Sequence, residues 1–155
     1  MLPLEYEFEI KNESKIIQIK NLKINEFLLI DCKPCKVLSI KRSKLTKLNE
    51  YEILIRGQDI FSDEVYTTLL SSRAEVEVPF IKNDVFLLIS IDNNKLCTLM
   101  DITGNTRTDL KLPYSKEKEQ KMSDKIIKYF KEKKEVLVTT CCSMNMEKIV
   151  AYKVL

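Results

Sequence analysis

The sequence contains no histidine among its 155 residues. Catalytic triads, general bases and metal sites that depend on an imidazole are therefore excluded. Only two glycines occur, Gly57 and Gly104, so no glycine-rich phosphate-binding loop is available. No apolar run is long enough for a membrane span, and the first ten residues, MLPLEYEFEI, are acidic, unlike the start of a secretion signal. These absences predict a soluble, cytoplasmic protein that binds no membrane, and they argue against an enzyme.

Disulfides and metal centres are not expected either. The five cysteines are an odd number and two of them are adjacent, which suits reduced thiols better than a disulfide framework: Cys32, Cys35, Cys97, Cys141 and Cys142. The first two form a C-x-x-C motif that lacks a second pair of ligands for zinc. We expect a turn cysteine followed by a strand cysteine, and no metal site.

Charge is unevenly distributed along the chain. The net charge is only +3, and residues 1–79 carry 12 basic against 13 acidic residues, whereas residues 80–155 carry 14 against 10. Six basic residues nevertheless fall between Lys33 and Lys47, with no acidic residue until Glu50. A local basic cluster in an otherwise acidic half predicts a polyanionic partner.

The first half reads as short strands. Residues 1–16 are interpreted as an N-terminal extension, and residues 17–79 as a small all-β barrel. Short apolar or alternating segments with polar breaks indicate its strands: Ile17–Ile19, Phe27–Ile30, KPCKVLSI, YEILIRGQDIF, EVYTTLL and AEVEVPF. Proline cannot continue a central ladder, so Pro79 marks the end of this domain.

The second half, residues 80–155, predicts five strands and one helix. Three strands are expected within 84–112, with turns at Asn93–Asn94 and Thr103–Asn105, and a hairpin follows within 135–155. Between them, residues 115–133 have helical apolar spacing and form one helix or two short ones, with Asp124 as a candidate cap of the second. A helix between the third and fourth of five strands is the layout of an OB-fold.

Four segments of the chain together resemble the eukaryotic translation factor 5A family. They occur in the family's order, and the resemblance covers about Ile17 to Leu155: PCKVLSIKRSKLTKLNEYEILIRGQDIF, VPFIKNDVFLLISI, LMDITGNTRTDLKLP and EVLVTTCCSMNMEKIVAYKV. The resemblance implies an SH3-like barrel that carries a basic hairpin, followed by an OB-fold.

The same resemblance implies a function without catalytic residues. Family members bind the ribosome near its exit and peptidyl-tRNA sites and promote peptide-bond formation at stalled sites, in elongation and termination. Their functional group is a hairpin lysine that deoxyhypusine synthase and a hydroxylase convert to hypusine; here that lysine is Lys47. We expect rRNA and peptidyl-tRNA as partners of a monomeric protein. Phosphate contacts would come from the residues around Lys47: Lys41, Arg42, Ser43 and Lys44.

The hairpin tip departs from the family pattern. Relatives read Lys-Thr-Gly-Lys-His-Gly-His, whereas this chain reads KLTKLNE from Lys44 to Glu50. Both glycines and both histidines are lost, and Glu50 brings a carboxylate that can pair weakly with the lysine. Two alternatives therefore stay open: a ribosome-bound factor that carries no hypusine, and a general RNA-binding OB module.

Other candidate groups have plainer explanations. The lysines between Lys116 and Lys134 are interspersed with glutamates, which favours a solvated helix face over an rRNA contact. Tyr114, Tyr129 and Tyr152 offer base stacking, although core roles are the simpler expectation. Neither Asp59 nor Asp109 has a partner that would suit catalysis.

Overall fold

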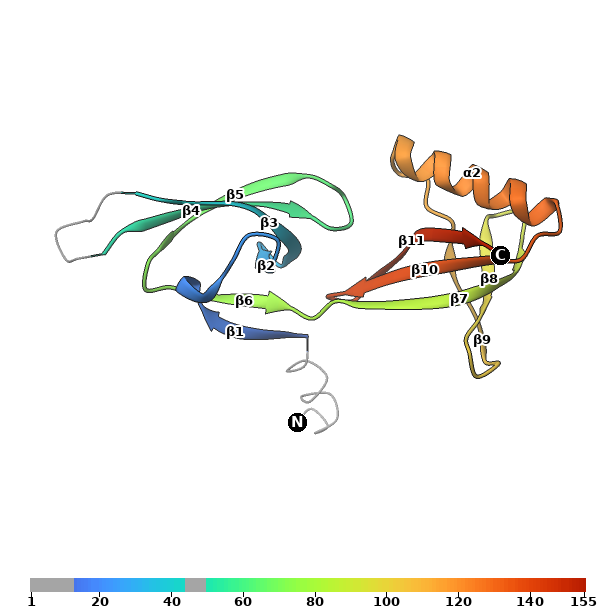
Figure 1. Cartoon of the computed structure of the whole chain (residues 1–155), viewed down its shortest axis with the longest axis horizontal. Coiled ribbons are helices and arrows are strands. Elements are labelled where there is room, and N and C mark those ends of the chain that lie inside the picture. The colour runs from blue at the N-terminus through green and yellow to red at the C-terminus, as the bar shows by residue number, and fades with distance from the viewer. Residues whose placement is uncertain (1–12, 44–49) are drawn as a thin grey trace. The chain divides into compact units, whose positions relative to one another are not determined.

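The chain forms two compact units, residues 1–80 and 81–155, in a computed structural model that describes residues 13–43 and 50–155. Both units are built mainly of β-strands, and the predicted all-β architecture is confirmed (Figure 1). No helix in the described part of the chain has the length and apolarity needed to cross a bilayer.

In its described residues, 13–43 and 50–80, the first unit contains six strands and one turn of 3-10 helix, η1 (Ile19–Asn21). Four strands form an antiparallel sheet in the order β2-β3-β4-β5, and β1 pairs separately with β6. The strands are β1 (Ser14–Gln18), β2 (Phe27–Ile30), β3 (Lys33–Arg42), β4 (Glu52–Asp59), β5 (Val65–Ser71) and β6 (Glu75–Pro79). β1 begins at Ser14, within the residues 1–16 that were interpreted as an N-terminal extension.

Alternation of side chains builds the core of this SH3-like barrel. Cys35 and Val37 on β3 and Ile53 and Ile55 on β4 point inward and are essentially inaccessible, as their period of two predicts. A bulge between Val37 and Ser39 shifts the register of β3 against β4. After this bulge Ile40 still faces the core, and the following residues continue the strand toward the basic segment.

Gly57 and Asp59, near the end of β4, have structural roles. A Cβ atom on Gly57 would lie 2.8 Å from Ile30 Cδ1 and 3.0 Å from Cys35 Cβ, so only glycine fits without a shift. The buried carboxylate of Asp59 accepts hydrogen bonds from the backbone N–H groups of Phe61 (2.8 Å) and Ser62 (3.3 Å). These contacts fix the turn into β5 and give Asp59 a structural role.

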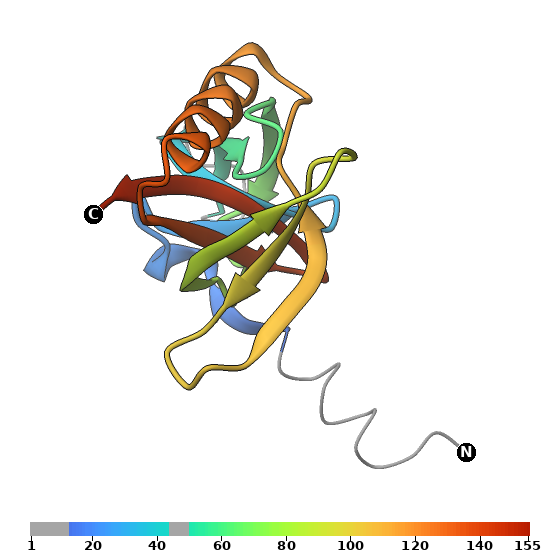
Figure 2. The ribbon, with the colours of Figure 1, turned by 90° about the vertical axis from the view of Figure 1, so that its right-hand side faces the viewer.

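The second unit is the predicted OB-fold arrangement. Its five-stranded sheet has the order β11-β10-β7-β8-β9, and α2 (Glu117–Lys131) follows β9. The strands are β7 (Lys82–Ile91), β8 (Leu96–Met100), β9 (Thr106–Lys111), β10 (Val136–Ser143) and β11 (Met146–Val154). In Figure 2, α2 (orange) lies alongside β11 (dark red), which it contacts.

Helix α2 is one uninterrupted helix, not the two short helices that the sequence also allowed. Its apolar side, with Ile126 fully buried, packs on the core of the second unit. The prediction that Asp124 caps a second helix is wrong: its carboxylate lies within the helix and accepts a hydrogen bond from the hydroxyl of Tyr114 (3.2 Å). The expected turn at Thr103–Asn105 is present, and Asp101 Oδ1 accepts hydrogen bonds from the backbone N–H groups of Thr103 (2.9 Å) and Asn105 (3.0 Å).

Candidate nucleic-acid interface

The stem of the basic hairpin is formed by β3 and β4. β3 and β4 are antiparallel, and Arg42 pairs with Ile53 at the end of the ladder. Beyond this pair the Ser43 N–H donates to the Glu52 carbonyl oxygen (2.9 Å), and the Glu52 N–H donates to Ser43 Oγ (3.0 Å). Ser43 therefore fastens the ends of β3 and β4 together. This role for the serine was not predicted from the sequence.

Lys41 and Arg42 are both exposed, but they lie on opposite faces of the sheet. Lys41 pairs with Leu54, whose other neighbour is Leu69, on the outer face. Arg42 pairs with the buried Ile53, and its guanidinium lies 5.6 Å from the ring centroid of Tyr51. The ring limits the freedom of Arg42 while its charge stays in water. Two cations are thus presented on the two sides of the stem end.

The remaining predicted residues of the tip, Lys44 and Lys47, lie outside the described residues. On the β4 side, Glu50 Oε1 lies 3.4 Å from Arg73 Nε, in an ion pair whose side chains are 33% and 70% exposed. The expected pairing of Glu50 with Lys47 involves a residue that the structure does not describe. Of the five predicted contact residues, the structure describes three, which follow one another at the stem end with Lys41 and Arg42 on opposite faces: Lys41, Arg42 and Ser43.

Lys33, the first residue of the basic cluster, is separate from this stem end. It lies at the other end of β3, roughly 30 Å along a strand of this length. Its ammonium donates to the hydroxyl of Tyr66 (3.0 Å) and lies 4.3 Å from that ring's centroid, and Tyr66 in turn donates to Glu64. The hydrogen bond to Tyr66 raises the pKa of Lys33. The basic cluster of the sequence is therefore not one patch in space.

The C-x-x-C motif separates into a turn and a strand, as expected. Asp31 and Cys32 have φ values of 49° and 63° in the two-residue turn between β2 and β3. Cys32 is exposed, whereas Cys35 is buried in β3, and burial raises the pKa of its thiol to about 11. The φ of 63° at Cys32 lies in the left-handed region, which glycine adopts more readily than cysteine. Among residues 13–43 and 50–155, no three metal-ligating side chains come together.

Asp109 also has a structural partner. Its carboxylate accepts from Arg107 Nε (2.7 Å) and Nη2 (2.6 Å), and Arg107 donates further to both oxygens of Glu147 (3.0 and 2.8 Å). The hydrogen bonds to Arg107 hold the pKa of Asp109 below its usual range. An aspartate held in this way is poorly suited to act as a general acid or base.

Both units match families of translation factor 5A. Residues 13–74 match the family described as "Translation initiation factor 5A-like, N-terminal", and residues 80–153 match "Eukaryotic elongation factor 5A hypusine, DNA-binding OB fold". Eukaryotic translation initiation factor 5A-2 of Saccharomyces cerevisiae is 31% identical over 137 residues, which cover 88% of this chain and 83% of the relative. Eukaryotic translation initiation factor 5A of Drosophila melanogaster matches with the same identity and the same coverage.

Solved structures agree. A translation initiation factor 5A family protein from Naegleria fowleri superposes with a TM-score of 0.85 at 31% identity, over 91% of this chain and 99% of the other. Eukaryotic translation initiation factor 5A from Methanococcus jannaschii has a TM-score of 0.65 at 21% identity, over 92% and 96%, and supports the fold alone. Similarity therefore extends across both units.

Proposed function

The chain belongs to the eukaryotic translation factor 5A family, and we propose that it binds the ribosome in the cytoplasm and promotes peptide-bond formation at stalled sites, in elongation and termination. The observation that supports this most directly is the exposed basic end of the β3–β4 stem. There Lys41 and Arg42 lie on opposite faces of the sheet, shortly before Lys44 and Lys47 in the sequence. We place the contact with rRNA and peptidyl-tRNA there.

The proposed mechanism needs no acid or base from the protein. The ribosome supplies the reaction centre, and the factor holds the acceptor end of the tRNA in a reactive geometry, which by orientation alone can lower a barrier by several kcal/mol. Cations on both faces of the stem suit phosphate groups on both sides, and such contacts position a protein without reading sequence. Ser43 keeps the stem closed below the tip.

Lys47 is the proposed functional lysine. We propose that deoxyhypusine synthase adds an aminobutyl group from spermidine and that a hydroxylase completes hypusine, giving a thin arm with two positive centres. Peptide mass spectrometry on protein purified from its native host tests this: a Lys47 peptide heavier by the mass of the modification supports it. An unmodified Lys47 in a protein that still pellets with ribosomes would remove hypusine from the proposal and favour the unmodified factor.

Ribosome co-sedimentation tests the interface itself. A triple variant of hairpin lysines, K41Q/K44Q/K47Q, is compared with K15Q/K20Q/K23Q, which removes the same charge from exposed lysines elsewhere in the first unit. We expect the hairpin variant to lose ribosome binding and the control to retain it. Equal loss from both variants would point to diffuse electrostatics. A wild-type protein that binds RNA oligomers but never pellets with ribosomes would favour the general RNA-binding module.

A further inference from the structure

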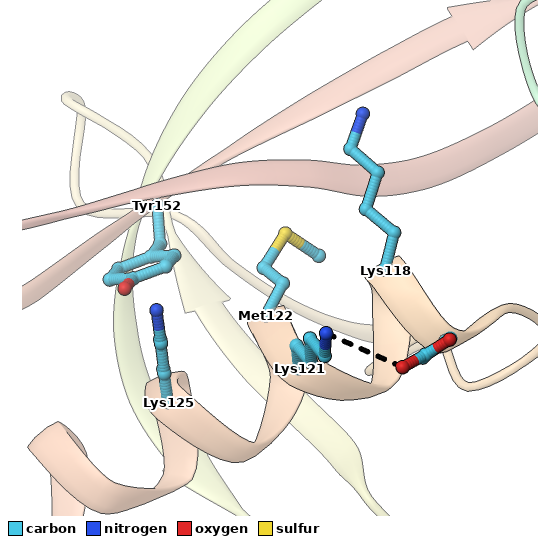
Figure 3. Close-up of a pocket in the computed structure, with 6 residues that line it drawn as sticks. Lys118, Lys121, Met122, Lys125 and Tyr152 are labelled. Carbon is cyan, nitrogen blue, oxygen red and sulfur yellow. Dashed lines mark ion pairs between the residues drawn. The ribbon is translucent and has the colours of Figure 1, made fainter.

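A groove with a basic rim lies between α2 and β11 of the second unit. We call it the α2 groove; its volume is about 430 Å³, and its lining residues are Glu117, Lys118, Lys121, Met122, Lys125 and Tyr152. Five come from the helix and one from the strand, about thirty residues later in the sequence. Figure 3 shows the Lys125 side chain directed toward the Tyr152 ring, with Met122 between Lys125 and Lys118.

Helical spacing places the three lysines on one face. Lys118, Lys121 and Lys125 are separated by three and four residues, so their side chains follow one another along the helix. The apolar floor comes from Met122 and Tyr152, which are half-buried and pack against the core of the second unit. The groove thus combines an apolar floor with a cationic rim.

The charges of this rim are largely uncompensated. Among the described residues, Glu117 is the one acidic residue that lines the groove. Its ion pair with Lys121 spans 3.3 Å, and the two side chains are 83% and 72% exposed. A pair so exposed contributes little and is easily exchanged. Within the part of the chain that the structure describes, no ion pair is found for Lys118 or Lys125. Two lysines are therefore available to an incoming anion.

A second aromatic ring, outside the groove lining, lies next to Tyr152. Tyr152 lies 6.1 Å from Tyr129, measured between ring centroids, and the ammonium groups of Lys128 and Lys134 lie 5.9 and 5.1 Å from the Tyr129 centroid. The two neighbouring tyrosine rings therefore lie among lysine side chains. A plain solvated helix face needs no aromatic floor.

We propose that the α2 groove binds single-stranded nucleic acid, with one base against Tyr152 and Met122 and the neighbouring phosphates on Lys118 and Lys125. Each base has a π-face that can stack on an aromatic side chain, and lysines that follow the backbone are the usual complement of such a platform. Binding of this kind does not depend on sequence. The site is separate from the basic hairpin, so it goes beyond the proposed function.

The test uses the full chain in a K41Q/K44Q/K47Q background, so that the hairpin does not contribute. Fluorescence anisotropy follows binding of a labelled oligouridylate of about ten nucleotides, within the usual range of OB-fold site sizes. The variant K118Q/K125Q is compared with K95Q/K111Q, which removes equal charge from exposed lysines that do not line the groove. Unchanged thermal melting shows that each variant folds.

We expect K118Q/K125Q to weaken binding and to reduce the slope of log K against log salt by about 1.4, since each single-strand phosphate contact contributes about 0.7. The control K95Q/K111Q should leave both quantities unchanged. Equal loss in the two variants would overturn the site in favour of general charge. Equally tight binding of polyglutamate of the same length would overturn it in favour of an acidic protein partner.

Tyr152 provides a second, independent readout. Y152L removes the ring but keeps apolar volume, whereas Y152F keeps the ring and serves as the matched control. Loss of one stacked base corresponds to roughly 5- to 150-fold weaker binding. We expect this for Y152L only, together with weak binding of an abasic oligonucleotide to the parent. An abasic oligonucleotide that binds as tightly as oligouridylate would overturn the stacking contact.

Discussion

At the scale of single residues, burial distinguishes the core cysteines of this chain from an exposed one. Cys35 and Cys97 are fully buried in the two units, and burial raises the pKa of each thiol to about 11. Since the thiolate is the reactive form, few of these groups ionise near neutral pH. Cys32, in its exposed turn, has no such protection.

Thiol labelling measures this difference. With iodoacetamide at pH 7.5, we expect Cys32 to be modified first, and Cys35 and Cys97 to react only on unfolding. Mass spectrometry of digests taken over time gives the order, and a sample in concentrated urea, in which all five cysteines react, is the control. Native Cys35 labelled as fast as Cys32 would contradict the buried position of β3.

The close packing around Gly57 predicts the effect of adding a methyl group there. The variant G57A places a Cβ 2.8 Å from Ile30 Cδ1 and 3.0 Å from Cys35 Cβ. We expect a loss of about 1–3 kcal/mol in the free energy of unfolding, the usual range for overpacking. Urea unfolding measures it.

The double variant G57A/I30V is the matched test, because valine lacks the Cδ1 atom that lies closest. It should recover part of the loss relative to the sum of the two single variants. Full additivity would show that the two positions do not contact each other.

At the scale of elements, one arginine joins the two edge strands of the second sheet. β9 and β11 are at opposite ends of the strand order, yet they contact each other, and Arg107 on β9 donates two hydrogen bonds to Glu147 on β11. The guanidinium also lies 5.5 Å from the ring centroid of Phe86. This half-buried ion pair helps close the barrel.

E147Q tests that closure. Only 29% and 19% of the Arg107 and Glu147 side chains are exposed, so we expect a loss of about 1–2 kcal/mol, above the value for surface pairs. The control is K82Q, which breaks the more exposed pair of Lys82 with Asp84 and should change stability by less than about 0.5 kcal/mol. Equal melting temperatures for E147Q and K82Q would show that the pair of Arg107 with Glu147 does not help to close the barrel.

The ion pair that attaches α2 to β11 makes the stability of the fold depend on pH. Glu119 Oε2 lies 2.8 Å from Lys148 Nζ and 3.9 Å from Lys116 Nζ. Desolvation by itself raises the pKa of Glu119, but the hydrogen bond and charge of Lys148 outweigh it, so the pKa is lowered. A lowered carboxyl pKa contributes stability above the unfolded value of about 4.3, and this contribution is lost as pH falls below it.

We therefore expect E119Q to be about 1 kcal/mol less stable than the wild type at pH 7, and this difference to shrink toward zero near pH 3. Urea unfolding of both proteins at the two pH values measures it, and other carboxylates cancel in the difference. A gap that stays constant with pH would mean that the pair with Lys148 does not stabilise the fold.

The sequence predicts these elements well where side-chain periodicity is local. Alternation in β3 and β4 identifies their buried faces, and the helical spacing of Met122 and Ile126 identifies α2. The cap at Asp124 was mispredicted because a cap and a helix-interior aspartate have the same local sequence. The bulge after Val37 leaves no signal in composition, because it depends on the register of two strands.

At the scale of the whole molecule, the two units expose cations on different kinds of secondary structure. The first unit carries them on a β-hairpin stem, and the second on a helix beside a tyrosine. The cations of the stem could be identified from the sequence, because Lys41 and Arg42 are adjacent in it. The α2 groove was not: the lysine-rich helix and Tyr152 were each identified, but only the packing of α2 on β11 brings them together.

The rate of peptide-bond formation on a template that stalls ribosomes tests the central claim most directly. We compare the wild-type factor with K47A and K44A in a reconstituted translation assay. If the hairpin works by positioning the tRNA through Lys47, K47A should lose most of the stimulation and K44A much less. Equal losses in the two variants, or full stimulation by K47A, would contradict the proposed role of Lys47.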